Sequence, residues 1–175
     1  MIGHGYYPRK AKDAQQGYPV EIKRWLCKVC GRTMAVLPDF LLSFRHYVVR
    51  VVEGVLEDHI ERKLSWAKVK EKNSPANFPA LRTMQRWCKA YGGEAVRWLG
   101  AVQETLAQQG SSSSWLDPQG EAPGAQTPAE ALLAASEYLL AWGKTQWAEA
   151  TGYGRNERLR FLWLWGANRG LGRLV

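Results

Sequence analysis

The stretch from Leu64 to Tyr91 constrains the fold most, because turn residues and prolines divide it into two short helical segments. Ser65 is a suitable N-cap for a helix that runs through Lys72, since its hydroxyl can accept a hydrogen bond from a first-turn N–H. The sequence Asn-Ser-Pro at 73–75 ends that helix, because proline lacks a donor and disfavours helical geometry in the residue before it. We therefore predict two helices joined by a turn.

The second of these helices has two chemically different faces. It begins near Pro79, a residue that suits a first helical turn. Its apolar face follows the i, i+3, i+7, i+10 spacing and consists of Leu81, Met84, Cys88 and Tyr91. Its opposite face carries Arg82, Gln85, Arg86 and Lys89. Arginine can bond guanine, glutamine can bond adenine and lysine can neutralise phosphate. The pattern predicts a helix-turn-helix that reads duplex DNA; the alternative is a helical hairpin with a solvated basic face.

The uneven distribution of charge favours the first of these readings. The net charge is +8, but residues 1–91 carry 17 Lys and Arg against 8 Asp and Glu. Residues 92–154 carry 2 against 7, and residues 155–175 carry 5 against 1. A basic half that contains the predicted helix-turn-helix is typical of a protein that binds the phosphate backbone.

The chain shows no sign of export or membrane insertion. An acidic membrane surface could attract the same basic charge, but no apolar run of about 20 residues is present. The first 17 residues lack the apolar centre of a signal peptide. Three cysteines (Cys27, Cys30 and Cys88) cannot form a disulfide framework, and their odd number argues against secretion. We expect a cytoplasmic protein.

Residues 1–26 have the composition of β-structure, with glycines and prolines between short aromatic or β-branched stretches. Within this region Val20, Ile22 and Arg24 alternate with Glu21, Lys23 and Trp25, as in one strand of a small hairpin. The sequence Leu37–Phe40 closes the strand region, so residues 1–40 are predicted to form a small β-ribbon.

A Cys-x-x-Cys-Gly motif follows the predicted hairpin. Cys27 and Cys30 can bind one tetrahedral zinc ion, and Gly31 relieves the tight turn after the second sulfur. A closed structural site needs four ligands, so zinc is predicted only at a half site. His4 is the nearest upstream candidate for a third ligand, although a lone histidine there is more often a surface residue. Cys88 is better explained as a small core residue, and a thioredoxin-like redox pair lacks its βαβ setting.

The residues after Phe40 form a strong helical pattern. An apolar stripe from Phe44 to Ile60 places Glu53 and Asp58 on the polar remainder of the helix. Gly54 within it costs about 1 kcal/mol relative to alanine, which suggests close packing. Together with the two helices above, this helix completes a trihelical unit over residues 41–91.

The second half of the chain is predicted to be helical on both sides of a linker. Residues 94–108 form an amphipathic helix within the segment 92–108, and the Ser-, Gly- and Pro-rich segment 109–127 is a flexible linker. Thr127 and Pro128 open a helix to about Ala150 within the C-terminal region 128–175. Most tryptophans lie inside these amphipathic helices, where burial explains them better than base stacking. The predicted fold class is mainly α with a small N-terminal β-ribbon, then a helix-turn-helix bundle and a further helical region.

Several motifs together resemble a known bacterial arrangement. They are Trp-x-Cys-x-x-Cys-Gly-Arg-Thr, then Leu-Pro-Asp-Phe-Leu-Leu, the apolar helix and a helix ending in Arg-Trp. This order is similar to the uncharacterised family of transposase-like proteins that carry a zinc β-ribbon followed by a helix-turn-helix. The resemblance covers residues 4–91, and more loosely the last twenty or so. It implies a DNA-binding protein associated with insertion sequences.

The chain departs from this family pattern at one place. In the family another Cys-x-x-Cys pair lies a few residues before the position of His4-Gly5, and this sequence lacks it. Either the true start lies upstream of Met1, or this member has lost its zinc and holds the ribbon by packing.

No catalytic motif is recognisable, so we expect a non-enzyme. A transposase nuclease would need three carboxylates on an RNase H-like sheet, but no run of strands follows residue 91 and Asp117 is the only aspartate there. An alternative to DNA binding is a protein-interaction or assembly module, because the acidic, Trp-rich residues 92–154 could form a homo-oligomer; a non-catalytic transposase remnant is a further alternative.

Overall fold

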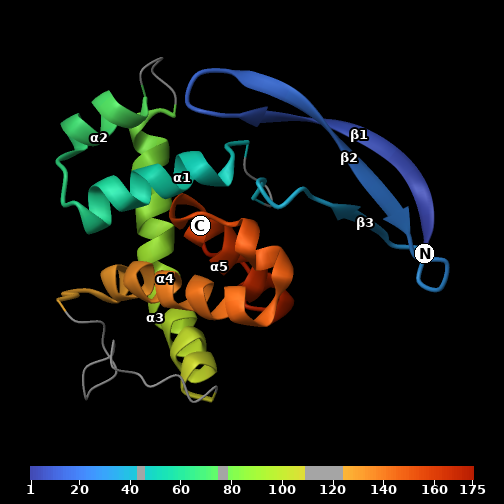
Figure 1. Cartoon of the computed structure of the whole chain (residues 1–175). Coiled ribbons are helices and arrows are strands. Elements are labelled where there is room, and N and C mark those ends of the chain that lie inside the picture. The colour runs from blue at the N-terminus through green and yellow to red at the C-terminus, as the bar shows by residue number, and fades with distance from the viewer. Residues whose placement is uncertain (43–45, 75–78, 109–123) are drawn as a thin grey trace.

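The fold is mainly helical with a small N-terminal β-ribbon, as predicted (Figure 1). The computed structural model describes residues 1–42, 46–74, 79–108 and 124–175. The strands are β1 (Ile2–Lys12), β2 (Gly17–Leu26) and β3 (Thr33–Val36). The helices are α1 (Val49–Leu56), the π-helical turn η1 (Glu57–Glu61), α2 (Trp66–Asn73), α3 (Leu81–Gln108), α4 (Pro128–Gln146), the 3₁₀ turns η2 (Ala148–Gly152) and η3 (Arg155–Glu157), and α5 (Arg158–Asn168).

The ribbon is an antiparallel sheet in the order β1-β2-β3. Asp13 closes the β1–β2 turn, because its Oδ1 accepts the backbone N–H groups of Gln16 and Gln15, each at 2.7 Å. These two bonds hold the pKa of Asp13 below its ordinary value. The predicted alternation in β2 is confirmed: Ile22 is fully buried, whereas Glu21 and Lys23 are exposed.

The hairpin end of the ribbon packs against the helices. The Lys12 N–H donates to the His46 carbonyl at 2.7 Å, and the Val48 N–H donates to the Lys12 carbonyl at 2.9 Å. Ala11 is fully buried beside this junction. The opposite end, with the N-terminus and the β2–β3 loop, extends away from the helical body (Figure 1). The ribbon is therefore a projecting arm anchored at one end.

The helix predicted from the Phe44–Ile60 stripe is shorter and partly irregular. α1 begins only at Val49, and the chain continues after Leu56 as the π-helical turn η1; Phe44 lies outside the described residues. The close packing inferred from Gly54 is confirmed, since a Cβ there would lie 3.0 Å from Oδ1 of Asn73 on α2.

The placement of Glu53 and Asp58 on a polar face was wrong. Both carboxylates are buried, at 2% and 1% exposure. The cause is the tertiary structure, because α2 and α5 bring hydrogen-bond donors to these two carboxylates. A helical pattern alone assigns such side chains to the solvent. Lys72 and Asn73 donate to Asp58 at 2.6 and 2.8 Å.

α2 has nearly the predicted limits, and Ser65 is its N-cap residue. However, the Ser65 side chain makes no capping hydrogen bond. Fully buried Val69 fixes this helix to the core, and the rings of His59 and Trp66 stack with their centroids 3.7 Å apart. The predicted turn at Pro75 lies outside the described residues.

The prediction of separate helices before and after residue 92 was wrong. α3 is one helix of 28 residues and passes through Gly92 and Gly93 without a break. Tertiary packing overrides the low helix propensity of glycine, because buried side chains on both sides of the pair, including Tyr91 and Ala95, hold one continuous face against the core.

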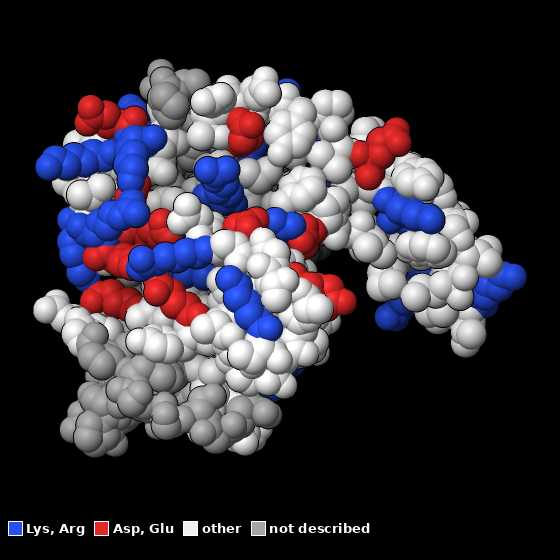
Figure 2. Space-filling model, in the orientation of Figure 1, with Lys and Arg blue, Asp and Glu red and all other residues white. Residues whose placement is uncertain are grey.

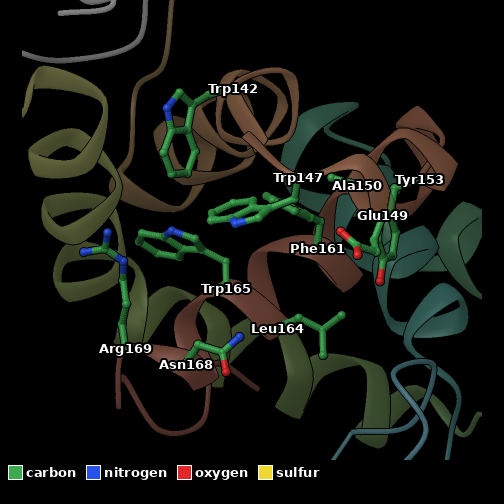
Figure 3. Close-up of a pocket in the computed structure, with 10 residues that line it drawn as sticks. All are labelled: Trp142, Trp147, Glu149, Ala150, Tyr153, Phe161, Leu164, Trp165, Asn168 and Arg169. Carbon is green, nitrogen blue, oxygen red and sulfur yellow. The ribbon is translucent and has the colours of Figure 1, made fainter. Parts of the chain in front are cut away.

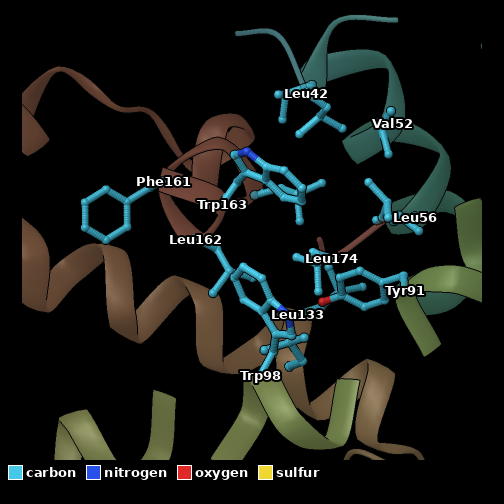
Figure 4. Packing of buried hydrophobic residues seen from close by; sticks show 14 of the residues in the cluster. Leu42, Val52, Leu56, Tyr91, Trp98, Leu133, Phe161, Leu162, Trp163 and Leu174 are labelled. Carbon is cyan, nitrogen blue, oxygen red and sulfur yellow. The ribbon is translucent and has the colours of Figure 1, made fainter. Parts of the chain in front are cut away.

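The core lies where α3, α4 and α5 meet α1 (Figure 4). Trp98 of α3 lies parallel to Trp163 of α5, with centroids 6.2 Å apart. Trp98 also lies against Gly166, where any Cβ would overlap the indole. The buried tryptophans Trp87, Trp98, Trp163 and Trp165 confirm the expectation of core packing, but Trp147 is 44% exposed.

The N-terminal signal of α4 is confirmed. The hydroxyl of Thr127 accepts the Glu130 N–H at 3.3 Å, and Pro128 occupies the first turn. The helix ends at Gln146, before the predicted limit near Ala150, and the chain continues as η2.

None of the helices in the described ranges combines the length and apolar character needed to cross a membrane.

Candidate nucleic-acid interface

The four predicted DNA-reading residues form one exposed row on the first half of α3. Arg82, Gln85, Arg86 and Lys89 follow i, i+3, i+4 and i+7 spacing, and all four are exposed. We call this row the reading face. Met84, Trp87 and Tyr91 on the other side of the helix are buried. The amphipathic pattern thus places the basic side chains in solvent, as predicted.

The cations of the reading face differ from those cations of the molecule that pair with carboxylates. Within the described residues, Arg82, Arg86 and Lys89 form no ion pair; Arg86 makes only a 3.4 Å hydrogen bond to the Thr83 hydroxyl. Ion pairs to carboxylates are made instead by Arg62, Lys63, Lys72, Arg97, Arg155, Arg158 and Arg160. The charges of the reading face are therefore available for an external anion.

A second group of basic side chains, on and around α2 and η1, is largely neutralised by carboxylates. Figure 2 shows Lys and Arg side chains gathered over α2 and η1, with Asp and Glu among them. Arg62 and Lys72 both pair with Asp58, at 2.5 and 2.6 Å, and Lys63 pairs with Glu130. Such pairs cancel much of the local positive potential, whereas the exposed Lys68 and Lys70 keep their charge.

The reading face is held rigidly by its own helix. The second half of α3 packs along α4 and buries Trp98, Val102 and Leu106. In the first half, the Trp87 ring meets Tyr47 edge-on, with centroids 5.2 Å apart. Since one continuous helix joins both halves, the exposed arginines project from a helix that is anchored in the core.

The Cys-x-x-Cys-Gly segment forms a tight turn between β2 and β3. The Cys27 sulfur accepts backbone N–H bonds from Cys30 and Val29, which lower the pKa of its thiol. The Gly31 N–H donates to the Cys27 carbonyl at 2.9 Å, and Gly31 adopts a φ of +67°. Cys27 and the exposed Cys30 lie on one tight turn, and their thiols are the kind of donor that a zinc ion takes.

The predicted third ligand does not join this pair. His4 lies in the irregular part of β1 between Gly3 and Tyr6. Over the described ranges, no group of three or more His, Cys, Asp or Glu side chains is arranged to hold a metal. Cys88 is half-buried in α3, and burial raises the pKa of its thiol to about 12, which agrees with a core role.

The sequence did not reveal a buried charge cluster around Arg158. The guanidinium of Arg158 is 2% exposed and pairs with Glu57, Glu61 and Glu137. Burial opposes its charged form, but the hydrogen bond to Glu61 and the surrounding carboxylates outweigh this and raise its pKa.

Glu53 lies at the edge of this cluster. Its Oε1 accepts the Leu159 N–H at 3.0 Å, while Oε2 has no partner among the described residues. Burial raises the pKa of Glu53 to about 8. No sequence signal could show this cluster, because Glu53 and Leu159 are 106 residues apart.

Comparison with known families relates the N-terminal half of the chain to a family model. Residues 1–87 match a family model described as a domain of unknown function (DUF6431). The match covers the ribbon, α1, α2 and the first two turns of α3, and so includes Cys27, Cys30 and most of the reading face. No curated protein and no solved structure is significantly similar to the chain.

Proposed function

We propose that this protein binds duplex DNA through the reading face of α3 and is related to transposases, without a catalytic step of its own. The observation that carries the proposal is the row of exposed cations that have no carboxylate partner within the described residues, on a helix anchored in the core. Cations that serve only stability are normally close to a carboxylate, as Arg158 is here.

The chemistry of the row suits the major groove. Arg82 and Arg86 can each present two parallel N–H groups to O6 and N7 of guanine, and Gln85 lies between them with an amide suited to adenine. Lys89, one turn further on, can neutralise a phosphate. Phosphate contacts position a protein on DNA and base contacts give specificity.

The ribbon supports this proposal as an accessory module. Its free end carries Lys28 and Arg32 beside the cysteines, and these cations can contact the backbone of a bound duplex. When bound, zinc would fix the β2–β3 loop through Cys27 and Cys30. The proposal also places the protein in the cytoplasm, where bacterial DNA is accessible.

Selection from a random duplex library tests the reading face directly. We expect the full chain to enrich a defined site. On that site Arg82→Ala and Arg86→Ala each lose about 1–3 kcal/mol of binding free energy and relax the preference at one position. Lys89→Ala weakens binding to all sequences alike. Enrichment of the same site by the two arginine variants, with unchanged affinity, would refute the assignment.

A further inference from the structure

A cavity of about 360 Å³ lies between the end of α4, η2 and α5, away from the reading face. Half of the ten residues that line it are aromatic: Trp142, Trp147, Tyr153, Phe161 and Trp165 (Figure 3). Its size and aromatic lining are typical of a small-molecule site rather than of a packing defect.

The aromatic wall is built from mutually fixed rings. Trp147 meets Trp142 edge-on, with centroids 5.1 Å apart and planes at 85°. The Tyr153 hydroxyl donates to Oδ2 of Asp39 at 3.0 Å, and Phe161 packs onto Gly143, where any Cβ would overlap its ring. Trp147, at the mouth, still leaves 44% of its surface exposed. The cavity is therefore preformed, with one uncovered indole.

The polar groups around the cavity are mainly positive or hydrogen-bond donors. Arg169 stacks over Trp165 at 4.9 Å from the ring centroid, and it makes no ion pair within the described chain. The indole N–H groups of Trp142 and Trp165 are buried without an acceptor there. In Figure 3 the nitrogen of Trp165 lies on the ring edge that faces Trp142. Since both nitrogens have almost no accessible surface, the charged donor that this side of the cavity offers to a ligand is the exposed Arg169.

The arrangement of charge decides between an anion and a cation. A ring of aromatic faces can also bind a quaternary ammonium group. Here, however, the guanidinium of Arg169 already occupies a face of Trp165 and would repel a second cation. Glu149 lies beside Tyr153 on the opposite side of the cavity (Figure 3), so it does not neutralise Arg169.

We propose that this cavity binds a small planar aromatic carboxylate. The ring lies among Trp142, Trp147 and Trp165, and the carboxylate pairs with Arg169 at the open side. This site is independent of the proposed DNA contact, since it shares no residue with the reading face.

The test uses the ¹⁵N-labelled full chain without DNA and follows the indole N–H resonances. The probes are indoleacetate and tryptamine, which carry the same ring and opposite charge. We expect indoleacetate to shift the signals of Trp142, Trp147 and Trp165 saturably, and to bind at least about fivefold more tightly than tryptamine.

Three variants assign the effect to the cavity. Arg169→Gln is expected to remove the preference for the carboxylate, while Lys144→Gln, which removes the same charge outside the cavity, preserves it. Trp147→Leu, at an exposed position that leaves the core intact, is expected to weaken both probes. The proposal fails if indoleacetate causes no saturable shift, if tryptamine binds equally or more tightly, or if Arg169→Gln retains the preference.

Discussion

Two groups of arginines on helices have opposite environments in this molecule. Arg158, in the first turn of α5, is 1% exposed and surrounded by Glu57, Glu61 and Glu137. Arg82 and Arg86, in the first two turns of α3, are exposed and form no ion pair within the described residues. Residue type and helical position are the same, so the difference comes from what the rest of the fold places beside each side chain.

This contrast separates structural charge from available charge. A buried guanidinium needs several carboxylates to offset its lost hydration, and removal of one member leaves the others unpaired in a low dielectric. An exposed guanidinium contributes little to stability but can release counterions from a polyanion. The two groups should therefore respond oppositely in stability and binding experiments.

The largest effect is expected for Arg158→Met. This substitution keeps much of the side-chain volume but leaves Glu57, Glu61 and Glu137 without their central cation, so we expect a loss of about 3–5 kcal/mol in the free energy of unfolding. Urea denaturation measures it. Arg82→Met is the matched control and should change stability by less than about 0.5 kcal/mol. Equal losses in the two variants would remove the contrast.

The pH dependence of stability tests the environment of Glu53 at the edge of the buried cluster. Its pKa in the folded chain is about 8, against an ordinary value of 4.5. The folded state therefore holds a proton that the unfolded chain releases between these values, so stability falls as the pH rises through this window. Glu53→Gln keeps the acceptor for the Leu159 N–H and cannot ionise.

We expect the stability of Glu53→Gln relative to the wild type to rise by on the order of 3 kcal/mol between about pH 5 and about pH 9. Urea midpoints measured side by side give this difference. A constant offset between the two proteins across the series would show that Glu53 ionises normally.

The smallest effect concerns the helix that joins the reading face to the core. Gly92 lies exposed inside α3, and a Cβ there would meet no atom within 4 Å. Gly92→Ala should therefore stabilise the protein by about 0.5–1 kcal/mol, seen as a higher melting temperature. A destabilised variant would indicate a helix break at this position, and the reading face would then not be fixed to the core.

The features that follow from local sequence could be predicted. The alternation in β2, the Thr127 cap of α4 and the exposure of the reading face depend on neighbouring residues. The continuity of α3 through Gly92 and Gly93 could not, because distant packing overrides glycine propensity there.

The burial of Glu53 and Arg158 also could not be predicted from the sequence. A helix-face pattern assigns charged residues to solvent, and their partners lie roughly 20 to 106 residues away along the chain. The aromatic cavity could not be predicted for a similar reason. Burial was correctly expected for Trp87, Trp98 and Trp163 but not for Trp147. The spacing of the tryptophans does not show that Trp142, Trp147 and Trp165 leave a space between them.

The most direct test of the central claim is the salt dependence of duplex DNA binding. The full chain is compared with Arg82→Ala/Arg86→Ala and with the control Lys144→Ala/Arg155→Ala, which removes the same charge elsewhere. We predict that log K falls steeply with log salt for the wild type and for the control. In the Arg82→Ala/Arg86→Ala variant the slope should be flatter, and binding should be weaker by at least about fivefold per substitution. Equal behaviour of the two variants, or no DNA binding by the wild type at low salt, would contradict the account.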